Sequence, residues 1–418
     1  MNKDFIIIVG HKTTKIIDIR KDNCVYEFDS VSKIIVDNLD KEEDEIVNII
    51  IKEYPNISKI NIINDYKDFI EELNQIGITK ETSKKVIVKN NDANISYCVI
   101  EITNKCCFKC DHCYIPNNNN YIDFETYQKI IDELSSINCN EILITGGEPM
   151  LHPRFDEMYL YAKNKGFLVS INSNLFLLNK KTLSILTKYK PRILEVSIYG
   201  TNNNQYELFT HVPNSYEIVI NNINKLINNE INVGIKTVLT KKTKDYIYKI
   251  KEYAENNNLP FRYDYIIFPK LNENVSNKER LSPKEIVQVL KKDKNTVDYY
   301  KDVIKNKLDD QNKTNNIFKC SVGKDRIFIT SDLSIQTCLL LQEKYNYNDY
   351  SLIESITTFN KEKEKMEYNK NNKCKSCNKK LLCRYCPGRF FLETGSYQIA
   401  PKFYCDLADE IIKEFKDD

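Results

Sequence analysis

Three cysteines in one short segment, Cys106, Cys110 and Cys113, constrain this chain more than any other feature. Thiolates at this spacing can share one metal centre. Structural zinc sites are closed by four ligands, and iron–sulfur clusters usually take four thiolates, so three cysteines saturate neither. The spacing alone leaves open a zinc site completed by His112 or Cys107. The alternative is an iron–sulfur cluster with one open iron, and an open position is where chemistry can enter.

The bulk composition is that of a globular chain with metal or redox chemistry. The 418 residues are 41% hydrophobic and 29% charged, and the net charge is +2, which gives no argument for nucleic acid or membrane binding. No apolar run approaches a membrane span, and the N-terminal run is too short for a signal peptide. Fourteen cysteines favour metal ligation over disulfides in a cytoplasmic chain. We therefore expect a cytoplasmic protein without nucleic-acid or membrane partners.

The distribution of cysteines divides the chain into three expected domains, at residues 1–90, 94–310 and 311–418. The first carries only Cys24, the second carries the triplet, and the third holds seven cysteines. The first segment has three short β-like runs followed by three helical patterns, the last ending at Gly77, a residue typical of helix C-termini. Within the second segment, residues 272–316 are polar and highly charged, and we expect them to form a connector.

The middle segment alternates strand and helix patterns. Repeated βα units predict a parallel sheet with helices outside, here an α/β fold of about six units that forms a partial TIM-like barrel. Chemistry is expected at the C-terminal ends of such strands. The expected strands are 99–103, 141–145, 168–172, 193–198, 232–239 and 261–268, and the expected helices are 124–135, 155–164, 180–188, 216–228 and 244–255.

A second motif, Gly146-Gly147-Glu148-Pro149, follows the next expected strand after the cysteine segment. Paired glycines let the backbone approach a ligand closely, and a carboxylate such as Glu148 can pair with an ammonium group. The motif alone could be an ordinary turn. Its position at a strand end, after the cysteine triplet, indicates a ligand site shared by the two motifs.

Together the two motifs resemble those of the radical SAM superfamily. The resemblance implies a 4Fe–4S cluster on Cys106, Cys110 and Cys113, with S-adenosylmethionine on the unique iron. Cleavage of this cofactor would give a 5'-deoxyadenosyl radical that removes hydrogen from an unactivated carbon. The Gly-Gly-Glu-Pro motif, Pro149 included, would bind its amino group. Further implied contacts are His112 near the adenine, Asn172, Ser173 and Asn174 near the ribose and carboxylate, and Ser197; the alternative for each is a polar residue that satisfies a loop backbone.

The last segment carries a second cysteine pattern. Two C-x2-C pairs are typical of a zinc ribbon, but seven cysteines exceed one zinc site and do not close two. Order and spacing resemble the SPASM extension of radical SAM enzymes, which holds two auxiliary 4Fe–4S clusters. The resemblance implies one cluster on Cys374, Cys377, Cys383 and Cys405, and the other on Cys320, Cys338 and Cys386.

The chain departs from the SPASM pattern in two places. Leu333 stands where the family has a glycine before the second cysteine, and the last pair is x2 where many members have x3. Neither departure removes a ligand, although the second auxiliary cluster has three evident cysteines. The remaining ones, Cys24, Cys98, Cys107 and Cys139, are expected to be ordinary free thiols.

The first segment resembles the PqqD-like recognition element of ribosomal-peptide maturases, and a small winged-helix-like domain is the alternative. With the resemblance, we expect a precursor peptide whose leader adds a strand to the sheet edge. The expected reaction is thioether formation from Cys sulfur to carbon, supported by an electron donor such as flavodoxin or ferredoxin. Alternatives are carbon–carbon or carbon–oxygen crosslinks, a sulfatase-maturase-like oxidation of Cys or Ser, and a non-enzymatic zinc module. Asp264 and Glu195 lie in expected strands, but nothing in the sequence selects a catalytic residue.

Overall fold

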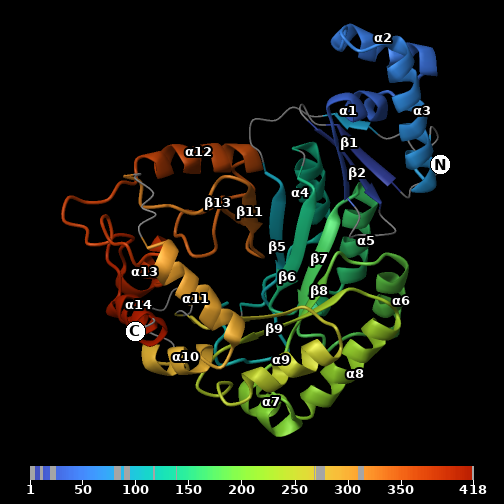
Figure 1. Cartoon of the computed structure of the whole chain (residues 1–418). Helices are drawn as coiled ribbons and strands as arrows, with labels where there is room; N and C mark the ends of the chain where they lie inside the picture. Colours follow the sequence, from blue (N-terminus) through green and yellow to red (C-terminus); the bar gives the residue numbers. More distant parts are fainter. Residues whose placement is uncertain are drawn as a thin grey trace.

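Two sheets organise the chain in the computed structural model (Figure 1). One has four strands in the order β3-β2-β1-β4, and the other has nine in the order β10-β9-β8-β7-β6-β5-β11-β12-β13. The structure describes residues 5–9, 13–18, 25–79, 86–88, 95–115, 118–137, 139–267, 269, 278–308 and 315–416. Cys24 lies outside these ranges.

The small sheet and three helices form the N-terminal part of the chain. The three expected strands pair in antiparallel fashion, and β4, which the sequence did not predict, adds parallel to β1. Apolar residues of the helices, among them Ile46, Ile50 and Leu73, are buried in a core that includes Ile16 of the sheet. The elements are β1 (Phe5–Val9), β2 (Thr13–Asp18), β3 (Val25–Asp29), α1 (Ser30–Asp37), α2 (Glu43–Glu53), α3 (Lys59–Gln75) and β4 (Val86–Val88).

Six parallel strands form the expected α/β partial barrel, which confirms the predicted fold class. Their buried positions are mostly β-branched or leucine, as in parallel sheets covered by helices. The strands are β5 (Tyr97–Thr103), β6 (Glu141–Gly146), β7 (Leu168–Ser173), β8 (Leu194–Ser197), β9 (Val233–Val238) and β10 (Phe261–Asp264). The outer helices are α4 (Phe124–Ser136), α5 (Phe155–Lys165), α6 (Lys180–Lys188), α7 (Asn203–Thr210), α8 (Ser215–Asn228) and α9 (Ile247–Asn256).

Two elements of the barrel differ from the sequence prediction. Helix α7 was not predicted, because its first residues are polar and give no apolar helical pattern. Its N-terminus is capped by Asn202, whose side chain accepts a hydrogen bond from the Gln205 N–H. Strand β10 ends at Asp264, although the apolar run continues through Ile267. Residues 265–267 are buried without pairing in the sheet. Their apolar side chains therefore indicate a buried segment and not a strand.

The C-terminal part is joined to the barrel through the sheet. Strand β11 pairs parallel with β5, and β12 and β13 follow in antiparallel order. Helices α10 and α11 of the connector share a hydrophobic core with α14. Elements of this part are α10 (Pro283–Leu290), α11 (Lys294–Asn306), β11 (Arg326–Ile329), β12 (Ser334–Gln336), β13 (Tyr345–Asn346), α12 (Leu352–Glu364), α13 (Pro387–Thr394) and α14 (Lys402–Phe415).

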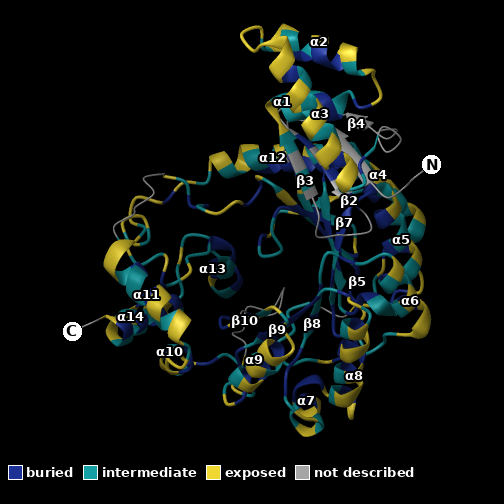
Figure 2. Cartoon of the chain, turned by 45° about the vertical axis from the view of Figure 1, so that its right-hand side comes forward, coloured by how far each residue is buried: buried dark blue, intermediate teal, exposed yellow. Residues whose placement is uncertain are grey.

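Burial follows this architecture. Figure 2 shows buried residues along the barrel strands and exposed ones on the outer faces of the helices. Among the helices in the described ranges, none is long and apolar enough to cross a membrane.

Candidate functional site

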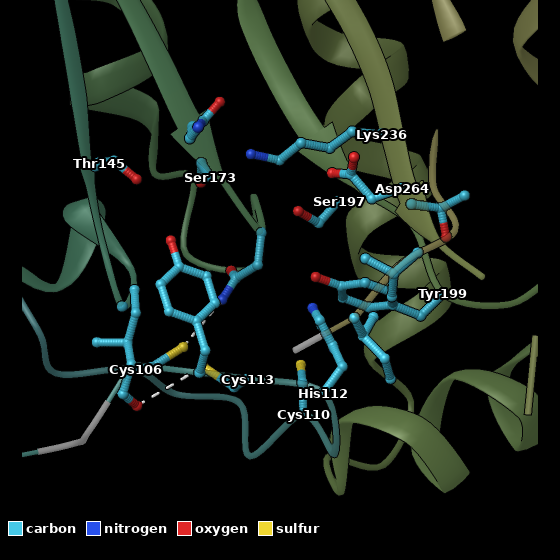
Figure 3. Close-up of a pocket in the computed structure, with 18 of the residues that line it drawn as sticks. Cys106, Cys110, His112, Cys113, Thr145, Ser173, Ser197, Tyr199, Lys236 and Asp264 are labelled. Carbon is cyan, nitrogen blue, oxygen red and sulfur yellow. Dashed lines mark hydrogen bonds between the residues drawn. The ribbon is translucent and has the colours of Figure 1, made fainter. Parts of the chain in front are cut away.

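A cavity of about 320 Å³ lies at the C-terminal ends of the barrel strands, where the fold places ligand sites. Loops after β5 and β6, the ends of β7 to β10 and one helix of the C-terminal part contribute to its wall (Figure 3). The lining residues with polar or ionisable side chains are Cys106, Cys110, His112, Cys113, Tyr114, Thr145, Asn172, Ser173, Asn174, Ser197, Tyr199, Lys236, Thr237, Arg262, Asp264 and Arg389.

The three cysteines of the first motif share one wall of this cavity. Burial raises the pKa of the Cys110 thiol, and the neighbouring Cys113 and Cys106 raise it further. The Phe108 N–H donates a hydrogen bond to the Cys106 sulfur at 3.4 Å. Cys107 is not one of the lining residues. Three neighbouring thiols are therefore available to one centre in the cavity.

His112 also lines the cavity, from within the cysteine loop. Its ring packs against both Tyr199 and Phe209, which stack on each other, with ring centroids 5.1 and 5.2 Å away. Burial lowers the pKa of His112 to about 4, so the imidazole is neutral at physiological pH. The ring offers a flat, uncharged surface to a ligand.

The glycine pair is required by close packing of two loops. A Cβ on Gly146 would lie 2.2 Å from the Thr103 carbonyl oxygen, and one on Gly147 would lie 2.4 Å from that of Lys105. The Gly147 N–H donates to the Thr103 carbonyl at 2.8 Å. The glycines therefore hold this motif against the start of the cysteine loop, in addition to lining the cavity.

Glu148 does not line the cavity, although the sequence placed it at the ligand. Its side chain is buried, and its carboxylate accepts hydrogen bonds from the Ser173 hydroxyl (2.8 Å), the Asn174 N–H (2.7 Å) and the Met150 N–H (3.0 Å). Burial raises the pKa of Glu148 to about 7, against these hydrogen bonds, which lower it. Glu148 ties the end of β6 to the end of β7, and the neighbouring Pro149 is buried beside it.

The polar residues expected at the ends of β7 and β8 line the cavity. These are Asn172, Ser173 and Asn174, with Ser197. Several lining residues of the described part of the chain carry a buried polar atom without a hydrogen-bond partner, among them Asn172 Oδ1, Thr237 Oγ1 and His112 Nδ1. Buried polar atoms are ordinarily paired, so the cavity fits a ligand that brings both a thiophilic metal centre and hydrogen-bonding groups.

Sequence reasoning missed three charged residues of the wall, Lys236, Arg262 and Arg389, and it did not select Asp264. A lysine within the otherwise apolar run of β9 was a usable signal, because lysine is rarely buried without a reason. Burial lowers the pKa of Lys236 to about 8, although the charge of Glu195 acts in the opposite direction. Arg389 could not be found from local sequence, since α13 is distant along the chain.

The structure brings the tail cysteines together in the two expected groups. Burial raises the pKa of Cys374 to about 11, and neighbouring Cys377 and Cys405 raise it further. Cys383 is close to the same three thiols. The second group is Cys320, Cys338 and Cys386. Burial raises the pKa of Cys338 to about 11, and the neighbouring Cys386 and Cys320 raise it further.

Within the described ranges, no three His, Cys, Asp or Glu side chains are arranged as a site for a single metal ion. The ligand roles of both groups remain predictions.

Two of the leftover thiols, Cys98 and Cys139, are buried in the barrel core. Cys107 differs, because a hydrogen bond with the Cys106 thiol lowers the pKa of Cys107, and its sulfur accepts a hydrogen bond from the Asn174 side chain at 3.4 Å.

Comparisons with known proteins agree with this site. Residues 100–254 match the family described as the Radical SAM superfamily. Over 166 residues the chain is 25% identical to Fe-coproporphyrin III synthase of Methanosarcina barkeri, covering 39% of this chain and 41% of that protein. It is 30% identical over 117 residues to the antilisterial bacteriocin subtilosin biosynthesis protein AlbA of Bacillus subtilis, covering 27% and 26%. The chain thus spans less than half the length of these curated relatives.

A solved structure shows a similar overall fold. Streptococcus suis SuiB bound to its precursor peptide SuiA superposes with a TM-score of 0.63 and 14% identity, over 97% of this chain and 99% of that one. The likeness in fold therefore extends beyond the barrel to both flanking parts, whereas the match to the Radical SAM superfamily is limited to residues 100–254.

Proposed function

We propose that this chain is a radical SAM maturase that installs thioether crosslinks, from Cys sulfur to carbon, in a ribosomally synthesised precursor peptide. The observation that carries the proposal is the cavity at the barrel's C-terminal end, which Cys106, Cys110 and Cys113 line together with residues whose buried polar atoms are unpaired. The radical SAM domain implies S-adenosylmethionine and a 4Fe–4S cluster. When bound, these cofactors supply abstraction of a hydrogen atom from carbon.

The residues of the chain bind and orient these groups. The three thiolates would hold the cluster and leave one iron for the cofactor. Neutral His112 would pack on the adenine, and Asn172 and Ser197 would meet the polar groups of the cofactor. Glu148 holds the ends of β6 and β7 in register through its three hydrogen bonds, and would attract the cofactor's ammonium from behind the wall.

The N-terminal part, residues 1–90, would capture the leader of the peptide. Strand β3 is an edge of the four-stranded sheet, and an exposed edge can accept a peptide strand through main-chain hydrogen bonds. The full-length likeness to SuiB bound to a precursor peptide supports this assignment, as does the similarity of the barrel to AlbA. We propose it as a PqqD-like recognition element, followed by the barrel and connector at 94–310.

The C-terminal part, residues 311–418, would hold two auxiliary clusters on the two cysteine groups. One of them would accept the electron that is left when the crosslink forms. A cytoplasmic one-electron donor such as flavodoxin or ferredoxin would reduce the cluster of the barrel.

The test of the proposal is anaerobic co-expression with a short Cys-containing peptide encoded near this gene. Thioether formation predicts a loss of about two mass units per crosslink, with a matching loss of alkylatable thiols. The same mass loss with intact thiols would indicate carbon–carbon or carbon–oxygen crosslinks. An unmodified peptide, with an enzyme that still cleaves S-adenosylmethionine, would reject the peptide as substrate and favour an oxidation of the sulfatase-maturase type.

A further inference from the structure

The carboxylates near the cavity differ in whether they are free to react. Glu195 is engaged, because Arg262 donates two hydrogen bonds of 2.6 Å to its carboxylate. Glu148 accepts three hydrogen bonds and does not line the cavity. Asp264 lines the cavity and has no ion pair or side-chain hydrogen bond within the described ranges. Two of the three acidic groups are therefore already committed to structural roles.

Lys236 is the free cationic group of the same wall. It extends from β9 into the cavity toward Ser173 (Figure 3). Among the described residues its ammonium makes no ion pair or side-chain hydrogen bond, whereas the neighbouring Arg262 is held by Glu195. An unpartnered lysine aimed into a cavity indicates that a ligand or a reacting group approaches it.

We propose that Lys236 is the catalytic base that takes the proton from the substrate's cysteine thiol as the thioether forms. The inference rests on the proposed thioether function and adds a residue to it. Its position is suitable because Lys236 and the cluster cysteines line the same cavity, so a thiol that enters to meet the carbon radical comes within reach of this side chain.

Matching of proton affinities favours Lys236 over its neighbours. A cysteine thiol ordinarily has a pKa of about 8.5, and burial brings the pKa of Lys236 to about 8. A general base is most effective when its pKa lies near the working pH. Carboxylates are ordinarily about four pKa units weaker than thiolates as bases. Neutral His112, with a pKa of about 4, is also too weak.

The charges around Lys236 set the pH range in which it works. Burial lowers its pKa; Glu195, Glu148 and Asp264 raise it, and Arg262 lowers it. Arg389 of α13 and Tyr114 line the same cavity. The base must be neutral to accept a proton, so crosslinking should increase as the pH increases through about 8.

The reaction balances with Lys236 in this role. The C–H bond breaks and its hydrogen atom leaves with the cofactor-derived radical. The S–H bond breaks and its proton goes to the neutral Lys236 amine. The C–S bond then forms, and the one remaining electron passes to an oxidised iron–sulfur cluster. The peptide loses two hydrogens per crosslink, as the thioether requires.

The test compares Lys236→Arg with Lys236→Met in the holoenzyme, using the peptide encoded beside the gene and deuterated at carbon. We expect both variants to lose about 100-fold or more in crosslinking rate, because neither side chain can accept the proton. Deuterium should still reach 5'-deoxyadenosine, and peptide affinity should stay unchanged. Ethylamine added to Lys236→Ala should restore crosslinking in part. Lys244→Met, which removes the 2.9 Å ion pair with Glu285 and changes no residue that lines the cavity, is the matched control.

Each alternative has its own result. If Lys236 only pairs with a carboxylate of the cofactor, Lys236→Arg will keep its crosslinking rate and Lys236→Met will lose affinity for S-adenosylmethionine, which overturns the inference. Crosslinking by Lys236→Met at the wild-type rate and with the wild-type pH profile also overturns it. If the wild-type enzyme makes no thioether, it is the proposed function that has failed.

Discussion

The two best-defined cysteine groups, around the cavity and in the tail, differ in number and in surroundings. Cys106, Cys110 and Cys113 line a cavity that also contains unpaired polar atoms. The tail group consists of four thiols, and none of them lines that cavity. They are Cys374, Cys377, Cys383 and the exposed Cys405. A complete set of ligands needs no cavity, whereas an open coordination position needs room for a reactant. Under the proposed function, cofactor chemistry belongs to the first group and electron transfer to the second.

The largest expected effect separates the two groups directly. Cys106→Ala removes one of three thiolates and should abolish formation of 5'-deoxyadenosine, because no cluster can bind the cofactor productively. Cys374→Ala should retain cofactor cleavage and lose crosslinking. Both products can be measured in one anaerobic assay by liquid chromatography and mass spectrometry. A normal crosslinked product from Cys374→Ala would show that the tail group is not needed for the reaction.

The next prediction concerns the contact between the glycine motif and the cysteine loop. Gly147→Ala places a methyl group 2.4 Å from the Lys105 carbonyl oxygen, next to Cys106 in the chain, so the loop must move. We expect a loss of about 3 kcal/mol in the free energy of unfolding and a large decrease in iron content. Gly234→Ala is the control, because the nearest atom to its methyl group is the flexible end of Ile193, at 3.0 Å, and the next residue it meets is Glu195 at an ordinary 3.6 Å. Urea unfolding and iron analysis compare the two; equal effects would contradict the proposed role of this contact.

The cavity shows which parts of the site could be predicted from sequence. Residues within a few positions of a recognisable motif, such as His112 and Gly146, line the cavity because local spacing fixes a loop, and their ligand roles stay predictions. Residues such as Arg389, which reach the cavity from a distant helix, depend on tertiary packing that no local pattern contains. Glu148 is a third case. The sequence identified its motif, but it could not show that the Glu148 side chain points away from the cavity lining and toward the end of β7.

The fold shows the same division. The barrel strands β5 to β9 were predicted because each is a buried apolar run. The pairing of β11 with β5 was not, because it joins segments more than two hundred residues apart, as in the register of Phe328 with Val99. Residues 265–267 are apolar and buried but do not pair in the sheet. Hydrophobicity alone cannot distinguish such a segment from a strand.

A prediction of intermediate size tests where the cofactor's ammonium lies relative to Glu148. Burial raises the pKa of this carboxyl to about 7, so near pH 7 it is about half protonated. An approaching ammonium favours the ionised form, and binding of S-adenosylmethionine should therefore release up to about half a proton at pH 7. Calorimetry in buffers of different ionisation enthalpy measures this release. Glu148→Gln should release none; release of equal size from that variant would exclude Glu148 as the group that titrates.

The smallest effect is expected on the outer side of the cysteine loop. The Asp111 carboxylate accepts hydrogen bonds from the His211 ring at 3.0 Å and from the Lys242 ammonium at 2.6 Å. Nearby, the Lys109 N–H donates to the Thr210 carbonyl at 3.0 Å. These contacts attach the loop that carries Cys110 to the end of α7 and to the segment after β9. The tail group has no part in this attachment, so weakening it should affect only the cluster of the barrel.

Asp111→Asn and Lys242→Met should each lower the free energy of unfolding by less than about 1 kcal/mol, because the pair is partly exposed to solvent. Both should accelerate loss of iron from the barrel to a chelator, while the iron of the tail is released at the wild-type rate. The double variant should be no worse than either single one, since the same interaction is removed. Strictly additive effects, or equal acceleration at both groups, would mean that the ion pair stabilises the fold in general and does not hold the cysteine loop in position.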